Sequence, residues 1–300
     1  MQQRRLGRDL VNQTQYVIVK AMKRRSNPVT DCMHIIFIFV YLNCWQYCSG
    51  CVTIHADIFD RRTVMWSGIF NASISCAIWS GLAMAHITIL TVTIFLHRSQ
   101  SHRAVDLHKS VMHFFRFWAW FTTGMITKRW VAVHRKHHAK AETQDDPHSP
   151  VIHGLSRILF NGVSYYRKAG QNAADVEKYG FGTPDDWLED NIYTPLHRHG
   201  IFVLLAMNVL FFGIYGFATW IIQILWIPFW AAGVVNGVAH YVGYRNFEVS
   251  DNSRNVFPLG IIIGGEELHN NHHAYGASAK FSVKWYEFDS GWMIIRCLEK

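Results

Sequence analysis

Long runs of uncharged, mostly apolar residues divide this sequence of 300 residues into segments. No Asp, Glu, Lys or Arg occurs in three of these runs, which cover residues 32–56, 63–97 and 200–244. Because about 20 helical residues cross a bilayer core of about 30 Å, runs of this length predict membrane spans. Buried helices of a soluble protein rarely stay uncharged for so long, so that alternative is disfavoured.

The runs predict an all-α integral membrane protein. Polar segments that contain most of the charged residues lie between and after the apolar runs and are expected outside the bilayer, at 97–199 and 241–300. The expected spans lie at about 72–95, 201–219 and 221–240, with a candidate first span at 33–54.

Charge changes this picture in two places. The net charge is +8, and seven basic residues precede the first apolar run, which predicts a cytoplasmic N-terminus by the positive-inside rule. The other basic residues are scattered, so no nucleic-acid partner is expected. In the aromatic stretch 110–126, Arg116 stands near the middle, which predicts an amphipathic or partly inserted helix instead of a full span.

Histidines cluster at the ends of the predicted spans. The pattern His-x-x-His-His occurs twice, beginning at His134 and at His269, and the remaining members of the set follow or end an apolar run. The span at 72–95 crosses the membrane, and the pair at 201–219 and 221–240 returns the chain to the side that contains His97. All of these histidines therefore lie at the same face of the membrane. The full set is His97, His102, His134, His137, His138, His240, His269, His272 and His273.

Nine imidazoles in this arrangement indicate two metal ions. Residues three and four apart share one face of a helix, where neutral imidazoles can bind a metal. Nine ligands exceed the coordination of one ion, whereas two six-coordinate ions suit the number and leave positions for water. Imidazole accepts Zn, Cu, Fe or Ni, and of these the redox metals use O₂. Asn236, four residues before His240, is a candidate to hold a metal-bound water.

Other side chains near these histidines are expected to support them. Metal-bound imidazoles need partners that fix their tautomer. His148, in the sequence DPHSP, is expected to be an ordinary hydrogen-bonding residue. His97 and His102 are five residues apart, about 140° round an α-helix, so we expect the helix to unwind there. The candidate carboxylate partners are Glu142, Asp145, Asp146, Glu266 and Glu267.

Four motifs resemble those of membrane fatty acid desaturases of the acyl-CoA branch, the stearoyl-type, delta-9-like enzymes, in their bacterial form. The resemblance covers about 70–300 and includes the intervals between motifs. It implies about four transmembrane helices beneath a cytosolic helical cap that holds a histidine-rich di-iron site. Residues 63–300 would form the desaturase domain, and residues 1–62 an N-terminal extension unlike the family. The motifs are FLHRSQSHRA, HRKHHAKAETQDDPHSP, NGVAHYVGYRNFEVSDNSRN and GGEELHNNHHAYGASAKFS.

The resemblance also implies the reaction and its requirements. The nine histidines would bind two iron ions, with Asn236 acting through a water and Trp130 beside a kinked acyl tunnel. The enzyme would use O₂ to introduce a cis double bond into a saturated chain. The chain would be carried by CoA, a carrier protein or a phospholipid. Electrons would come from a separate ferredoxin-, rubredoxin- or cytochrome-type protein and its reductase, at the cytoplasmic face of the bacterial inner membrane.

Two other functions compete with this interpretation. A di-iron fatty acid or alkane hydroxylase would share the histidine scaffold, but the specific motifs favour a desaturase. A non-enzymatic membrane metal-binding protein with a transport role would place ionisable residues inside its spans, whereas here the histidines lie beyond the span ends.

Overall fold

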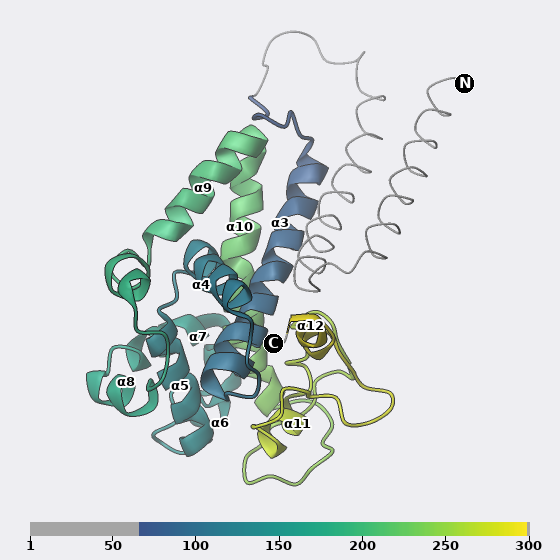
Figure 1. Cartoon of the computed structure of the whole chain (residues 1–300). Coiled ribbons are helices and arrows are strands. Elements are labelled where there is room, and N and C mark those ends of the chain that lie inside the picture. Colours follow the sequence, from purple (N-terminus) through teal and green to yellow (C-terminus); the bar gives the residue numbers. More distant parts are fainter. Residues whose placement is uncertain (1–65, 299–300) are drawn as a thin grey trace, which may run out of the picture.

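The structure is a computed structural model that describes residues 66–298, so the candidate span 33–54 and the extension 1–62 lie outside the described residues. Three long helices stand upright on a broader layer of short helices and loops (Figure 1). These helices are α3 (Ile74–Leu90), α9 (His199–Phe212) and α10 (Gly216–Ile227).

The first apolar helix is longer than its predicted span at 72–95. Ser73 caps it by accepting the N–H of Cys76 at 3.3 Å, and it continues without a break into the π-helical segment η1 (Thr91–Ser101). The stretch Ile74–Ser101 has 28 residues and a mean hydropathy of 1.7, so its length and composition suit a membrane crossing. Every residue of η1 is buried, which places its polar end inside the lower layer.

The second apolar stretch, His199–His240, has a mean hydropathy of 2.2 and also suits a membrane crossing. It folds back at η3 (Gly213–Tyr215), beside Tyr215 and Gly216, where the sequence predicts a turn within the apolar run, so only the boundary at 220 between the two predicted spans lies too late. A Cβ at Gly213, which has φ +59°, would lie 1.9 Å from the carbonyl oxygen of Trp66, so this turn requires glycine. The 14 residues of α9 rise about 21 Å, less than the predicted span. Beyond α10 the helix continues as η4 (Pro228–Val235) and η5 (Val238–His240).

Small residues allow α3 and α10 to pack closely. A Cβ at Gly81 would lie 3.1 Å from the carbonyl oxygen of Thr219, and the Thr219 hydroxyl donates to the carbonyl of Ala77 at 3.0 Å. This contact fixes the two helices against each other. It therefore also positions the histidines that stand at their lower ends.

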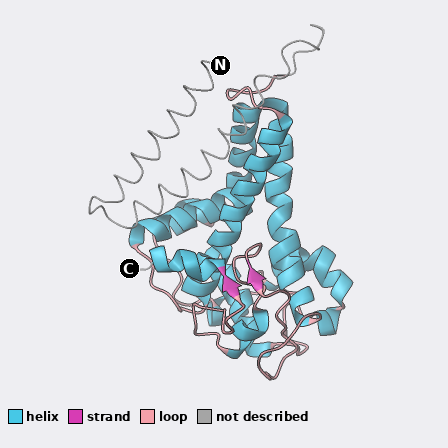
Figure 2. Cartoon of the chain, turned by 90° about the vertical axis from the view of Figure 1, so that its right-hand side faces the viewer, coloured by secondary structure: helices cyan, strands magenta, loops and turns pink. Residues whose placement is uncertain are grey.

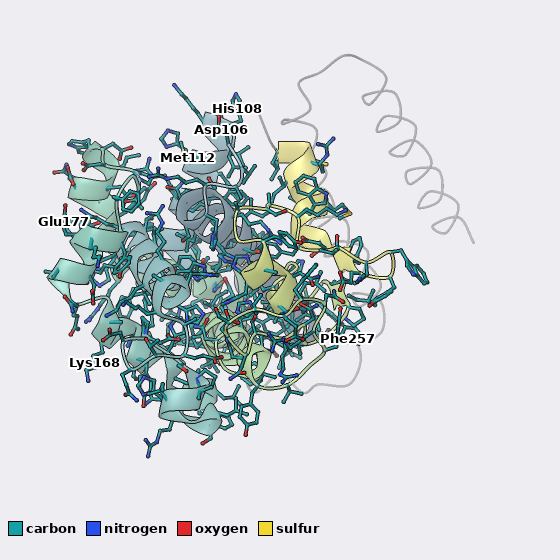
Figure 3. All side chains as sticks on the ribbon, turned by 90° about the horizontal axis from the view of Figure 1, so that it is seen from below. Asp106, His108, Met112, Lys168, Glu177 and Phe257 are labelled. Carbon is teal, nitrogen blue, oxygen red and sulfur yellow. The ribbon has the colours of Figure 1, made fainter. Side chains whose placement is uncertain are left out.

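The lower layer has two parts. Seen from below, Lys168 and Glu177 of the first part lie on the opposite side from Phe257 of the second (Figure 3). The first part contains α4 (Lys109–Thr123), α5 (Thr127–Lys140), α6 (Pro150–His153), α7 (Leu155–Ala169), α8 (Ala173–Tyr179) and η2 (Glu189–Tyr193). The second contains the parallel strands β1 (Leu259–Gly260) and β2 (Phe288–Asp289), visible in Figure 2, with α11 (His269–Ala274) and α12 (Ser290–Leu298).

The helix expected at 110–126 is α4, and its central arginine does not face water. Arg116 is buried, and its guanidinium pairs with the carboxylates of Asp186 at 2.6 Å and Glu189 at 3.2 Å. The charge therefore ties α4 to the η2 region.

Candidate metal centre

Four elements bring the nine histidines together. α5 carries one triplet and α11 carries the other. η1 carries His97, with His102 directly after its last residue, and η5 carries His240. At the end of η1 the N–H of His102 donates to the carbonyl of His97, five residues earlier, at 3.1 Å. The helix ends between these two histidines, as expected, but it does not uncoil there. A π-turn, whose bonds join residues five apart, brings the two ring centroids to 4.8 Å instead.

Five histidines form the first group, in which one nitrogen of each lies within 4.8 Å of those of the others. Their Nε2 atoms face one another. The Nε2–Nε2 distance is 2.8 Å between His102 and His134, and 3.0 Å from His272 to His97 and to His138.

Four histidines, His137, His240, His269 and His273, form the second group, again within 4.8 Å. The Nε2 atoms of His240 and His269 lie 3.1 Å apart. The Nε2 atoms of His137 and His273 are buried and have no hydrogen-bond partner among residues 66–298. A buried polar atom without a hydrogen-bond partner destabilises the folded protein, so a ligand is expected at these two nitrogens.

The nitrogens are suited to hold two metal ions. A metal–imidazole bond of about 2.1 Å places adjacent nitrogens on one ion about 3 Å apart, which matches the observed spacing. Burial, reinforced by neighbouring histidines, lowers the pKa of His102 to about 2 and that of His273 to about 3. Burial likewise lowers the pKa of His134 and His272 well below the usual value. These four imidazoles are therefore neutral and present the lone pairs that a metal requires.

Carboxylates lie against the outer nitrogen of four of these rings. A carboxylate that accepts from Nδ1–H fixes the tautomer in which Nε2 carries the inward lone pair. The Nδ1–oxygen distances are 2.6 Å for His97 and Glu266, 3.0 Å for His137 and Asp146, 3.4 Å for His240 and Glu142, and 2.8 Å for His273 and Asp251.

Three of the five carboxylates proposed from the sequence hold a histidine in this way, and two do not. Asp145 is exposed and makes no hydrogen bond to a histidine of the described residues, and Glu267 accepts the backbone N–H groups of Ile263 and Gly265 instead. The sequence does not point to Asp251. Its place in the motif that contains His240 is the one feature of the sequence that could have identified it. Tertiary contacts, which the sequence does not show, determine how the loop brings Asp251 back to the site.

His148 is not the ordinary hydrogen-bonding residue expected from its context. It is buried, its ring stacks on His137 with centroids 4.5 Å apart, and neither ring nitrogen has a partner within the described part of the chain. An ion bound by His137 lies in the plane of that ring, and a ring stacked nearly parallel to it does not point at the same ion. His148 therefore supports one face of His137, while Asp146 holds its Nδ1.

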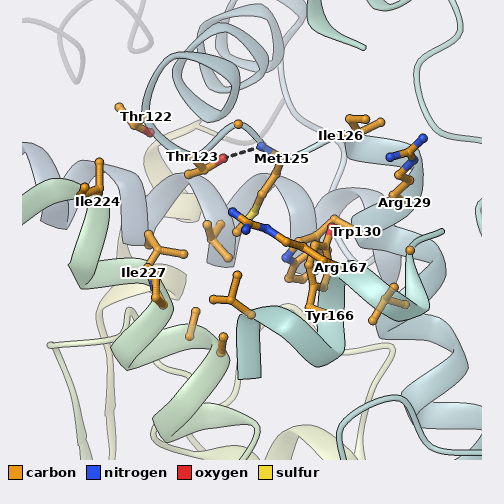
Figure 4. A pocket seen from close by; sticks show the side chains of 18 of the residues that line it. Thr122, Thr123, Met125, Ile126, Arg129, Trp130, Tyr166, Arg167, Ile224 and Ile227 are labelled. Carbon is orange, nitrogen blue, oxygen red and sulfur yellow. Dashed lines mark hydrogen bonds between the residues drawn. The ribbon is translucent and has the colours of Figure 1, made fainter. Parts of the chain in front are cut away.

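A cavity of about 610 Å³ reaches the histidines from one side (Figure 4). His97, His134, Trp130 and Asn236 are among the residues at its inner end, and the Trp130 ring stacks on His134 at 5.1 Å between centroids. Many of the other lining side chains are apolar, and most of these come from η1, α9, α10 and η4. This volume lies within the range of small-molecule pockets, roughly 300–1,000 Å³.

Comparison with known sequences identifies the family. The sequence pattern of the family described as "Fatty acid desaturase" matches residues 74–296. The chain belongs to the fatty acid desaturase family. The match covers all nine histidines and their carboxylate partners, so desaturation is the activity of this enzyme, and the alternative of a hydroxylase is not favoured.

Similar relatives of this desaturase act on different acyl carriers, according to their names. It is 28% identical over 214 residues to an sn-1 stearoyl-lipid 9-desaturase of Anabaena variabilis, covering 70% of this chain and 75% of the relative. It is 31% identical over 229 residues to delta-9 acyl-lipid desaturase 1 of Arabidopsis thaliana, covering 74% and 73%. An acyl-CoA 5-desaturase of Anemone leveillei is 31% identical over 234 residues, covering 74% and 69%. Sequence identity therefore does not select the carrier.

Proposed function

We propose that this desaturase uses two iron ions and O₂ to introduce a cis double bond at the delta-9 position of a saturated acyl chain. The observation that carries the proposal is the pair of inward-facing imidazole groups at the inner end of a largely apolar cavity. Iron bound there would supply O₂ activation and the removal of two hydrogens. The first group would hold one ion and the second group the other, and Asn236, which lines the cavity, would hold a metal-bound water.

The residues around the cavity determine which carbons react. An alkyl chain offers no polar handle, so its position depends on the shape of the cavity. Trp130 lies against His134 and fills part of the inner end, where it limits how the chain can bend past the histidines. The carboxylates on the outer nitrogens keep the imidazoles oriented while the chain is bound.

We further propose that the apolar stretches cross the bilayer and that the lower layer is a cytosolic cap. The two stretches of suitable length support this placement, and the uncharged run at 33–54 would complete a set of four spans. Basic residues before that run favour a cytoplasmic N-terminus. In a bacterial cell the enzyme would then lie in the inner membrane and receive electrons at its cytoplasmic face from a separate ferredoxin-, rubredoxin- or cytochrome-type protein and its reductase.

Expression in a host without an O₂-dependent desaturase, followed by fatty acid profiling and iron analysis, tests the function. His137→Ala removes a nitrogen of the second group, so iron and unsaturated product are expected to decrease together. His113→Ala is the matched control, because His113 is exposed on α4 and belongs to neither group. Undiminished product from a His137→Ala protein without iron would contradict the proposal, and an alcohol as the main product would favour a hydroxylase.

A further inference from the structure

The cavity has a second end, away from the histidines, between α9 and α10. Ile201 and Phe202 of α9 line this end on one side, and Ile224 of α10 lines it on the other. The indole N–H of Trp220 donates to the carbonyl of Ile201 at 3.0 Å and bridges the two helices, so the opening lies beside this contact, between Phe202 and Ile224. Figure 1 shows that the two helices meet at η3 and diverge from there toward the lower layer. The outer part of the cavity is therefore bounded by two diverging membrane helices.

The outer end opens through an apolar surface. Phe202 lines the cavity, yet 64% of its surface is exposed. Val203, Ile221 and Leu225 on the same two helices are also large, apolar and exposed. A contiguous apolar surface on a stretch with the composition of a membrane span faces lipid. An opening beside Phe202 therefore leads into the bilayer.

Three arginines line the same cavity. They are Arg129, Arg167 and Arg198, and none of them forms an ion pair with a carboxylate of residues 66–298. Arg198 directly precedes α9 and stands about one turn before Phe202. In Figure 4 the side chain of Arg167 extends across the cavity toward Met125. Guanidinium groups without a protein partner are well suited to bind phosphate oxygens.

We propose that the opening between α9 and α10 is a lateral portal for the acyl chain of a membrane phospholipid. The proposal rests on the desaturase function and adds the acyl carrier and the route. The chain passes from the bilayer between Phe202 and Ile224 toward His134, while the phosphate stays with the arginines at the end of the apolar stretch. The arginines lie where the phosphate of a membrane phospholipid would be, and the apolar opening lies where its acyl chain would be. The site therefore matches a lipid that is already in the bilayer.

Two labels in one reaction identify the carrier. Cells that express the protein are grown so that their phospholipids contain deuterated stearoyl chains, and their washed membranes are then mixed with ¹³C-labelled stearoyl-CoA. Desalted soluble extract and NADPH supply electrons, and ATP is left out so that released chains cannot be activated again. Mass spectrometry of the lipids and of the CoA fraction reports which label has lost two hydrogen atoms.

The expected result is an unsaturated deuterated chain in intact phospholipid. Product that carries only the ¹³C label would overturn the portal and leave the desaturase function intact. If neither label is desaturated by membranes that contain iron-loaded protein, the proposed function itself is contradicted, and the portal with it.

A paired substitution on α10 tests the location of the portal. Ile224→Trp narrows the opening, so we expect the deuterated product to fall by roughly an order of magnitude at unchanged iron content. Ile221→Trp adds the same bulk one turn away, on an exposed site that does not line the cavity, and should leave the product unchanged. Equal product from the two variants would overturn the assignment of the portal.

A second pair tests the charge and does not depend on tolerance of a bulky side chain. Arg198→Ala removes one exposed guanidinium from the opening and should lower the deuterated product about fivefold, the effect of one basic residue near an anionic lipid. Arg157→Ala removes an exposed arginine outside the cavity lining and serves as its control. Equal effects of these two substitutions would show that the phosphate is not held at Arg198.

Discussion

Asp251 provides the most direct test of how the carboxylates support the metal centre, because the sequence gives little reason to suspect it. One carboxylate oxygen lies 2.8 Å from Nδ1 of His273, and the other accepts the N–H of Ser253 at 2.9 Å. The side chain of His273 is only 1% exposed, so water does not readily replace the lost interaction. Asp251→Asn keeps the shape and an acceptor oxygen but removes the charge.

The expected size of the effect follows from these contacts. A hydrogen bond to a charged group contributes about 1.5–3 kcal/mol and a neutral one about 0.5–1.5 kcal/mol, so the substitution weakens the support of His273 by about 1 kcal/mol. Loss of such an outer partner usually lowers metal affinity by about 10- to 100-fold. We expect Asp251→Asn to lie near the tenfold end of this range. Asp251→Ala, which also removes the acceptor of Ser253, should approach the other end.

Iron retention during competition with a chelator is the appropriate assay, with the metal measured by mass spectrometry of the purified protein. Asp145→Asn is the matched control, because it is the same chemical change at an exposed carboxylate near the first triplet. The control should release iron as the parent protein does. If Asp251→Asn and Asp145→Asn retain iron equally, the orientation of His273 does not depend on this carboxylate and the reasoning is refuted.

Two further predictions concern stability. Arg98→Met leaves the charge of Asp289 without its cation in a site where both side chains are 0% exposed, which should cost about 3–5 kcal/mol in the free energy of unfolding. The double variant with Asp289→Asn removes that charge and keeps an acceptor for the N–H groups of Phe281 and Trp292, so it should recover part of the loss; thermal unfolding in detergent measures both. The low pKa values of His102 and His273 mean that the unfolded chain takes up protons below about pH 6.5 while the folded metal-free protein does not, so stability is full above that pH and falls toward pH 3. At about pH 5.5 each of these two imidazoles should lower the free energy of unfolding by about 1.4 kcal/mol. An unfolding temperature of the metal-free protein that stays constant between about pH 7.5 and 5.5 would contradict this.

The histidine set can be predicted from the sequence because the triplets repeat a spacing with a clear helical meaning. The backbone that presents His97 and His102 cannot be read from an α-helical wheel. Their separation of five residues puts them on different faces of an α-helix, and only the wider π-turn of η1 brings them together. Sequence periodicity assumes one winding throughout, so it misses a local change of winding at the end of a long helix.

Contacts between distant segments are the other feature that the sequence does not reveal. The role of Asp251 depends on how its loop returns to the site, where the N–H of Arg254 donates to the carbonyl of Ala239 at 2.7 Å. The burial of Arg116 depends on two acids about 70 residues later in the chain. Proximity in sequence identified Glu142, Asp146 and Glu266, but it also selected Asp145, which points away into solvent.

The geometry explains why each triplet has three histidines and why they are adjacent in this order. On α5, His134 and His138 belong to the first group and His137 to the second; on α11, His269 and His273 belong to the second group and His272 to the first. On an α-helix, the fifth residue is rotated by about 40° from the first about the helix axis, so both can face the same metal site. The fourth residue is rotated by about 60° in the opposite direction, so it faces the other metal site. Each helix therefore gives two ligands to one site and one to the other. Both groups include histidines of α5 and of α11, so neither site can shift without disturbing the other.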